Sequence, residues 1–286
     1  MASASEDNGS QAVGTLQRFY DASSYPTASY LLQHALGIVS ASSQHEEIIF
    51  RHVQKAWAEV VCDQMDEIME HRTIRKNYNS ATSILRLRIW PTSILHAHQP
   101  WITNAKRYWL SSGRITINEF ETLENVVGTT VTFNQGPYRG SRKEPDGMIV
   151  PVGLIMPTVV LETGWSESRN QLRGDMNLWL VGGNGAVKAV LILTWSKVGT
   201  TDTVTGDAEY YTLDWNGMPV LAERHVIFPA PPPHQAQTQT LNLTRRILFG
   251  DAMAAGAKPY DVFPFRFDDL RGIARRCLVD EGLVLA

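Results

Sequence analysis

Pro157-Thr-Val-Val-Leu-Glu-Thr-Gly164 is the stretch of sequence from which the fold class follows. Its unbroken apolar run, Val159 to Leu161, is typical of a strand that is buried on both faces, and the glycine is expected to end the strand. Apolar residues then recur at helical spacing from Leu172 to Leu180 and predict a helix that ends at Gly182-Gly183. Residues 187–193 return to a buried strand. Because strand, helix and strand follow one another, we expect a parallel crossover in an α/β fold.

Size and composition fit an ordinary globular protein. The chain has 286 residues, of which 43% are hydrophobic, and this is enough for a large core. Its 26 basic and 29 acidic side chains give a net charge of −3, so any contact with nucleic acid must come from a local basic patch. The chain contains only two cysteines, Cys62 and Cys277, which favours a reducing intracellular compartment, cytoplasmic or nuclear. No run of 18 apolar residues occurs, so we expect no membrane-spanning helix.

The N-terminal part is expected to be a disordered tail followed by helices. Residues 1–14 are rich in Ser, Ala and acidic residues and lack an apolar core, unlike a secretory signal or a transit peptide. Residues 15–82 are expected to form a helical region. Its main helix is predicted over residues 44–69, because Ser43 and Glu46 have capping-box spacing and apolar residues recur on one face. This helix could pack on the core or on a second copy of the chain, as in a homodimer.

Strand and helix signals alternate in the next segment. Residues 83–90 alternate apolar residues with arginines and predict a half-buried strand. Residues 100–113 predict a helix, which begins at a proline and ends at a glycine. A further helix is expected to begin at the capping box of Thr116 and Glu119 and to end at Gly128.

Two antiparallel hairpins are predicted in the core. Segments 129–134 and 146–150 are β-prone and are separated by loop-like sequence, so we expect them to pair. Segments 210–215 and 218–228 flank Asn216-Gly217, the dipeptide best suited to a two-residue type I′ turn.

These elements together predict a mixed central sheet flanked by helices over residues 83–228. A proline-rich stretch from Pro229 to Pro233 is expected to be a stiff connector. Residues 229–286 are therefore expected to form a C-terminal appendage, with a helix near residues 268–280.

One acidic residue lies within the buried apolar strand and requires an explanation. An ionised Glu162 there would cost several kcal/mol without a partner, so it needs a cation, an arginine or a proton. Asp146 is a natural companion, because a short connection favours adjacent strands, and two convergent carboxylates can bind Mg²⁺. The alternative is a strand-end glutamate paired with Arg169 or Arg173.

The sequence around these acids resembles the PD-(D/E)XK nuclease superfamily, especially uncharacterised fungal proteins and bacterial Uma-type putative endonucleases. The resemblance covers roughly residues 94–193. The residues that carry it are Arg142-Lys143-Glu144-Pro145-Asp146, Pro157 to Glu162, Ser166-Glu167-Ser168, and Leu172, Asp175 and Trp179 of the following helix. It implies a restriction-endonuclease-like fold with helix, hairpin, strand, helix and strand in that order.

The same resemblance implies a metal-dependent nuclease. Asp146 and Glu162 would hold Mg²⁺ or Mn²⁺, and Thr163 would add its backbone carbonyl. The reaction implied is phosphodiester hydrolysis of DNA or RNA, with a metal-bound water as nucleophile.

The sequence also departs from the family pattern. The family lysine two residues after the glutamate is Gly164 here. The cations that could replace it by proximity in sequence are Lys143, Arg169, Arg173 and Lys188, each of which is equally well explained as a solvated surface cation. A glutamate of the preceding helix is often part of the family site, and His96, His98 and Gln99 occupy the nearest segment.

Two further residues beside the glutamate have alternative interpretations. Ser166 could neighbour the site, although capping of the next helix by Ser166, Glu167 or Ser168 explains it equally well. Trp165 could stack on a base or belong to the core.

Two functional hypotheses from different classes therefore remain. The first is a metal-dependent nuclease with Asp146, Glu162, Lys143 and Ser166 at the active site. The second is a catalytically inactive nuclease-like fold that binds nucleic acid or protein as a scaffold.

Overall fold

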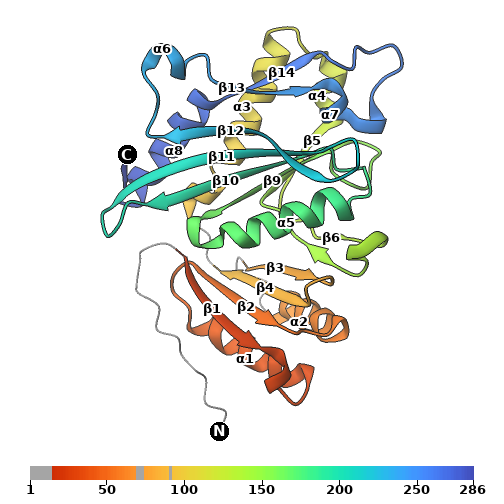
Figure 1. Cartoon of the computed structure of the whole chain (residues 1–286), viewed down its shortest axis with the longest axis vertical. Helices are drawn as coiled ribbons and strands as arrows, with labels where there is room; N and C mark the ends of the chain where they lie inside the picture. Colours follow the sequence, from red (N-terminus) through yellow and green to blue (C-terminus); the bar gives the residue numbers. More distant parts are fainter. Residues whose placement is uncertain (1–14, 69–73, 90–91) are drawn as a thin grey trace. The chain divides into compact units, whose positions relative to one another are not determined.

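The computed structural model in Figure 1 describes residues 15–68, 74–89 and 92–286, and the predicted tail 1–14 lies outside them. The chain divides into two compact units. Unit 1 comprises residues 1–92 and 132–144, and unit 2 comprises residues 93–131 and 145–286. This division differs from the predicted boundaries at residues 82 and 229.

Unit 1 is built on a mixed sheet with the strand order β1-β2-β4-β3-β7-β6. Its elements are β1 (Leu16–Asp21), α1 (Ala28–Ala41), β2 (Glu46–Arg51), α2 (Lys55–Ile68), β3 (Ile74–Asn79), β4 (Ile84–Ile89), β6 (Val131–Thr132) and β7 (Arg142–Lys143). Strands β1 and β2 are parallel, whereas β2, β4 and β3 pair antiparallel. One face of the sheet packs on α1 and α2 in a common apolar core.

The predicted helix over residues 44–69 is wrong in its first half. Residues 46–51 form β2, which pairs with a strand on each side, and the helix begins only at Lys55. The run Ile48-Ile49-Phe50 suits a central strand, and its pairing overrides the helical spacing. The region predicted to be helical is therefore a mixed α/β unit.

The predicted strand over residues 83–90 is confirmed as β4, but it is not half-buried. Arg86 and Arg88 are both buried, as are the apolar residues that alternate with them. Arg88 forms an ion pair of 3.4 Å with Glu47, its register partner on β2.

Unit 2 is built on a seven-stranded sheet with the order β12-β11-β10-β9-β8-β5, in which β15 also pairs with β11. The elements that form the sheet and cross it are β5 (Leu123–Val126), β8 (Gly147–Pro151), β9 (Val159–Trp165), α5 (Arg169–Gly182), β10 (Ala189–Lys197), β11 (Thr203–Leu213), β12 (Pro219–Phe228) and β15 (Val284–Leu285). The predicted crossover is confirmed, since β9 and β10 are parallel and α5 connects them. Strand β9 continues one residue past Gly164, which does not end it.

Helices cover both faces of this sheet (Figure 1). Helix α5 packs on one face of β9 and β10. The elements on the other face are α3 (His98–Ser111), α4 (Ile117–Thr122), β13 (Thr240–Thr244), α7 (Arg245–Phe249), β14 (Val262–Arg266) and α8 (Phe267–Asp280). Trp101 and Trp109 of α3 donate their Nε1–H groups to backbone carbonyls of Arg266 and Pro264. Residues 229–286 are thus part of the core rather than an appendage.

Three local predictions need correction. The helix at the confirmed capping box of Thr116 ends at Thr122, and β5 follows it. Segments 129–134 and 146–150 do not pair, because β6 joins the sheet of unit 1 while β8 pairs with β5 and β9. The β11–β12 hairpin is present, but Asp214 closes a longer loop by accepting the Gly217 amide and donating its own to Met218.

Candidate functional site

Asp146 directly precedes β8, and Glu162 lies on the neighbouring strand β9 of unit 2. The antiparallel register of β8 and β9 pairs Gly147 with Leu161, so one further step places Asp146 beside Glu162. The amide of Thr163 donates a hydrogen bond of 2.7 Å to Asp146 Oδ2. The predicted adjacency of the two acidic residues is therefore confirmed.

The backbone of Asp146 is held in place by a buried histidine. His98 Nε2 lies 2.9 Å from the Asp146 carbonyl oxygen, and Nδ1 lies 3.0 Å from the carbonyl oxygen of Leu95. Which of the two ring nitrogens donates to its carbonyl oxygen depends on the tautomer. The next residue must be glycine, because a Cβ at Gly147 would lie 2.7 Å from the imidazole Cδ2. The His98 imidazole thus contacts the main chain of Asp146.

The carboxylate of Glu162 is held by α5. Its Oε1 accepts a hydrogen bond of 2.7 Å from Trp179 Nε1, and the side chain is fully buried. Arg169 and Arg173, the alternative partners considered for Glu162, both bind carboxylates of β11.

Thr163 presents its main chain to Asp146. In an extended strand the N–H and C=O of one residue point to the same side. Since the Thr163 amide binds Asp146, its carbonyl also points toward that side. The hydroxyl of Thr163 accepts a hydrogen bond of 3.3 Å from Trp195 Nε1.

The donor set is chemically suited to a hard cation. Two carboxylates and a backbone carbonyl are oxygen ligands of the kind that Mg²⁺ and Mn²⁺ bind. Among residues 15–68, 74–89 and 92–286, no cluster of three or more His, Cys, Asp or Glu side chains is placed to hold a metal ion. Any metal here would therefore depend on the main-chain oxygen and on water as well as on Asp146 and Glu162.

Gly164, where the resemblance would place a lysine, is tightly packed. A Cβ at Gly164 would lie 3.1 Å from Leu172 Cδ1 and 3.4 Å from Ser168 Cβ. Ser168 is buried and directly precedes α5, but within the described part of the chain its side chain makes no capping hydrogen bond. Ser166 begins a short 3-10 turn, so the predicted serine cap of α5 is not formed.

The other predicted neighbours belong to several different elements. Lys143 is buried on β7 in unit 1. Lys188 donates to the Gly185 carbonyl and lies 4.0 Å from Asp251. Trp165 is buried in the apolar core of unit 2, so of its two interpretations the core role is the one that the structure supports. Asp175 of α5 is buried, with an exposed fraction of 8%.

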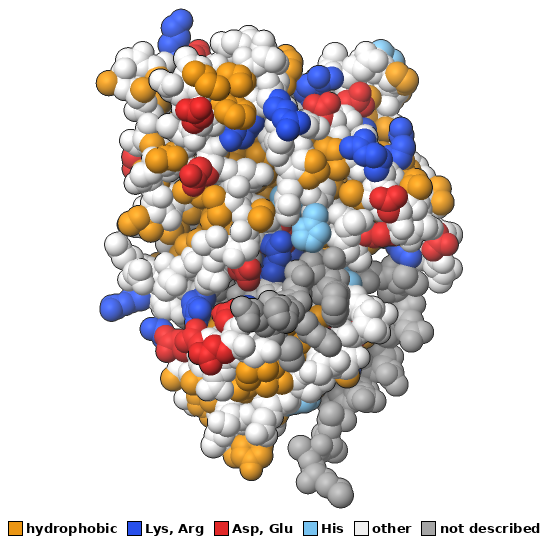
Figure 2. Space-filling model, turned by 180° about the vertical axis from the view of Figure 1, so that it is seen from behind, with side chains coloured by type: hydrophobic (Ala, Val, Ile, Leu, Met, Phe, Trp, Pro, Cys, Tyr) orange, Lys and Arg blue, Asp and Glu red, His pale blue; other side chains and the backbone are white. Residues whose placement is uncertain are grey.

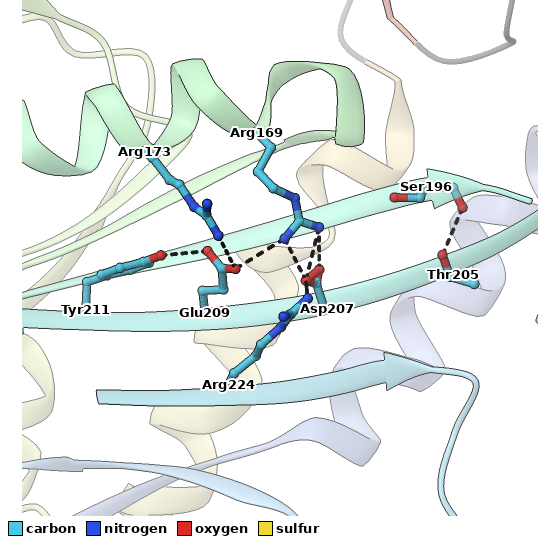
Figure 3. A network of polar contacts seen from close by, with 8 residues as sticks. All are labelled: Arg169, Arg173, Ser196, Thr205, Asp207, Glu209, Tyr211 and Arg224. Carbon is cyan, nitrogen blue, oxygen red and sulfur yellow. Dashed lines mark hydrogen bonds and ion pairs between the residues drawn. The ribbon is translucent and has the colours of Figure 1, made fainter. Parts of the chain in front are cut away.

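Sequence reasoning missed a polar network on the same face of the sheet (Figure 3). Arg169 and Arg173 of α5 and Arg224 of β12 converge on Asp207 and Glu209 of β11. The i, i+4 spacing of the helical arginines and the i, i+2 spacing of the strand acids are visible in the sequence. What the sequence does not show is that the two elements face each other.

Hydrogen bonds control the ionisation of Glu209 within this network. Burial alone would raise the pKa of its carboxyl, but hydrogen bonds from Arg173 and Tyr211 and the charge of Arg169 outweigh burial and lower the pKa. The Tyr211 hydroxyl lies 2.8 Å from Glu209 Oε2. Glu209 is therefore a buried anion at neutral pH.

Comparison with known proteins assigns no family to the chain. No family model matches the sequence, and no curated protein is significantly similar to it. Within the described residues, every helix is too short or too polar to cross a membrane.

Proposed function

We propose that unit 2 is a restriction-endonuclease-like domain with a metal-dependent phosphodiester-cleaving site at Asp146 and Glu162. The observation that carries the proposal is that Asp146, directly before β8, accepts a hydrogen bond from the main chain of Thr163, the residue that follows Glu162 on β9. The connectivity supports it. Strands β5, β8 and β9 pair antiparallel, and α5 leads to β10, which is parallel to β9. This is the element order that the resemblance implies.

The residues of the chain have separable roles in this proposal. Asp146 and Glu162, with the Thr163 carbonyl, would hold Mg²⁺ or Mn²⁺. When bound, the metal would acidify a water ligand and offset the charge that develops on the phosphate. His98 fixes the backbone of Asp146, and Trp179 orients the Glu162 carboxylate.

A specific observation also favours the second candidate, a catalytically inactive scaffold with the same fold. Gly164 stands where the resemblance would place a lysine, and Leu172 and Ser168 pack closely against it. Asp146 and Glu162 are both buried and already accept hydrogen bonds from their own chain. This candidate requires an intact fold without cleavage.

Metal binding and cleavage separate the two candidates. Mn²⁺ affinity is measured by calorimetry, and cleavage of single- and double-stranded DNA and RNA is assayed in Mg²⁺ and in Mn²⁺. Asp146→Asn and Glu162→Gln are compared with Asp251→Asn, a control on a side chain that is 87% exposed. We expect both site variants to lose cleavage and to bind Mn²⁺ at least about tenfold more weakly. The control should match the native protein.

Other outcomes are equally informative. Equal cleavage by all four proteins would indicate a contaminating nuclease and refute the site. Native-like circular dichroism without Mn²⁺ binding or cleavage would favour the scaffold. A homodimer also remains a prediction, which light scattering during size-exclusion chromatography tests directly.

A further inference from the structure

We propose that Arg173 and Arg224 form a second contact surface, on which the phosphates of a nucleic-acid strand bind. The proposal rests on the proposed function for the choice of polymer, but it uses other side chains than Asp146 and Glu162. We call this surface the arginine shelf, and its members are Arg169 and Arg173 of α5, Asp207 and Glu209 of β11, and Arg224 of β12.

The arginine shelf lies on the face of the sheet that α5 covers. Asp207 and Glu209 are two positions apart on β11, so their side chains lie on the same face, and their register partners on β12 are Val226 and Arg224. Arg169 Nη2 and Arg224 Nη2 each lie 2.9 Å from Asp207, and Arg173 Nη2 lies 2.9 Å from Glu209 (Figure 3). Guanidinium groups from α5 and β12 thus bind the carboxylates of β11.

The charge that meets the solvent on the arginine shelf is positive. Three guanidinium groups and two carboxylates leave a net charge of +1. The carboxylates lie inside, with Asp207 13% and Glu209 1% exposed. The cations lie outside, with Arg173 45% and Arg224 56% exposed. An approaching anion therefore meets guanidinium groups before it meets a carboxylate.

This arrangement contrasts with other parts of the surface. On the face seen in Figure 2, basic and acidic side chains are interspersed among the described residues. The chain as a whole carries a net charge of −3, so long-range attraction of a polyanion is not expected. Binding would then depend on a local group of arginines such as the arginine shelf.

The arginines have donors to spare, and their positions are already fixed. A guanidinium carries five N–H donors, and Arg224 uses one nitrogen, Nη2, for Asp207. Arg173 likewise binds Glu209 through Nη2. The remaining N–H groups can donate to phosphate oxygens, often two at once. Because the carboxylates hold the side chains in place, little further ordering entropy is lost on binding.

Apolar side chains flank the exposed arginine of β12. Leu221 and Val226 are 48% and 49% exposed. Their register partners on β11 are Tyr211 and Asp207, and the partner of Arg224 is Glu209. These three β11 residues are two positions apart, so their side chains lie on the same face of the sheet. The three β12 side chains therefore share one face. A cation between two apolar side chains can contact a phosphate and the neighbouring sugars or bases.

The test measures binding without metal, so it does not depend on catalysis. A fluorescein-labelled oligodeoxythymidylate is titrated in EDTA, and anisotropy is followed at several salt concentrations. We expect Arg173→Gln and Arg224→Gln each to weaken binding by about 3-fold to 10-fold and to reduce the salt slope by about 0.7. Arg276→Gln, an exposed arginine of α8, should leave both unchanged. Because no metal is present, cleavage at Asp146 and Glu162 plays no part in this measurement, and the test separates this proposal from the proposed function.

Charge-preserving variants distinguish a binding role from a structural one. Arg173→Lys and Arg224→Lys keep the charge, so they should retain the salt slope even if the unfolding temperature falls as in the glutamine variants. Three results would overturn the proposal: no oligonucleotide binding by the native protein, equal binding by the glutamine variants, or binding of anionic lipid vesicles in place of the oligonucleotide.

Discussion

Glu209→Gln isolates the contribution of one buried anion to the stability of unit 2. The native carboxylate accepts hydrogen bonds from Arg169, Arg173 and Tyr211 at 3.2, 2.9 and 2.8 Å. Glutamine has the same shape and keeps one acceptor oxygen, but it removes the negative charge and one acceptor. The variant therefore tests the ionic part of the network with little change in packing.

The expected cost follows from the exposure of the partners. Breaking a fully buried ion pair costs about 3–5 kcal/mol. Glu209 is 1% exposed, but Arg169 and Arg173 are 26% and 45% exposed and regain water when the anion is lost. After this solvent screening, we expect the free energy of unfolding to fall by about 1–2 kcal/mol. Asp251→Asn, a solvent-exposed control, should change it by less than about 0.5 kcal/mol.

Urea unfolding followed by tryptophan fluorescence measures this difference in unit 2. Of the eight tryptophans of the chain, the six from Trp101 onward belong to unit 2. The effect must also depend on pH. Because the pKa of Glu209 is lowered in the folded state, its contribution is present above the ordinary value of 4.5 and is lost as pH falls through the folded pKa. Equal stability of Glu209→Gln and Asp251→Asn at pH 7, or a deficit that persists unchanged at low pH, would refute the reasoning.

Three further predictions concern packing at two glycines of unit 2 and the pKa of a carboxyl group in unit 1. Gly164→Ala should lower the free energy of unfolding by about 1–3 kcal/mol, because the new methyl group would lie 3.1 Å from Leu172 Cδ1. Gly174→Ala in helix α5 should raise the free energy of unfolding by about 0.5–1 kcal/mol, since no neighbouring element lies within 4 Å of the new methyl group. A loss of stability in this variant would contradict the prediction. In unit 1, the hydroxyl and then the amide of Ser23 lower the pKa of Asp21 from 3.8 to about 2. NMR titration should show this value, and Ser23→Ala should raise it; stability from Asp21 is present above pH 3.8 and is lost as pH falls toward 2.

The crossover was predictable because its signals are local. The apolar run of β9, the helical spacing of α5 and the apolar run of β10 each lie within one short window, and burial on both faces follows from composition. The prediction for β2 failed because the deciding signal is not local. Its apolar residues also fit a helix, and only its pairing with β1 and β4 decides the outcome.

Long-range packing explains the error at the C-terminus. Trp101 contacts Phe265 and Phe267 with ring centroids 5.1 and 5.5 Å apart, and Trp109 contacts Phe263 and Phe265. More than 150 residues separate these partners in the chain. Local periodicity carries no information about such contacts, so a proline-rich stretch was interpreted as the start of a separate segment.

Prediction of the candidate site succeeded for geometry fixed by strand register and failed for partners fixed by packing between elements. Asp146 lies beside the strand of Glu162 because a short connection makes β8 and β9 neighbours. The partners of Arg169 and Arg173 lie 36 to 40 residues away on β11, and no local pattern identifies them. The same crossover links the two surfaces. Trp179 of helix α5 binds Glu162 of β9, and the same helix places Arg169 and Arg173 over β11. Variants that loosen α5 should therefore disturb the candidate site and the arginine shelf together.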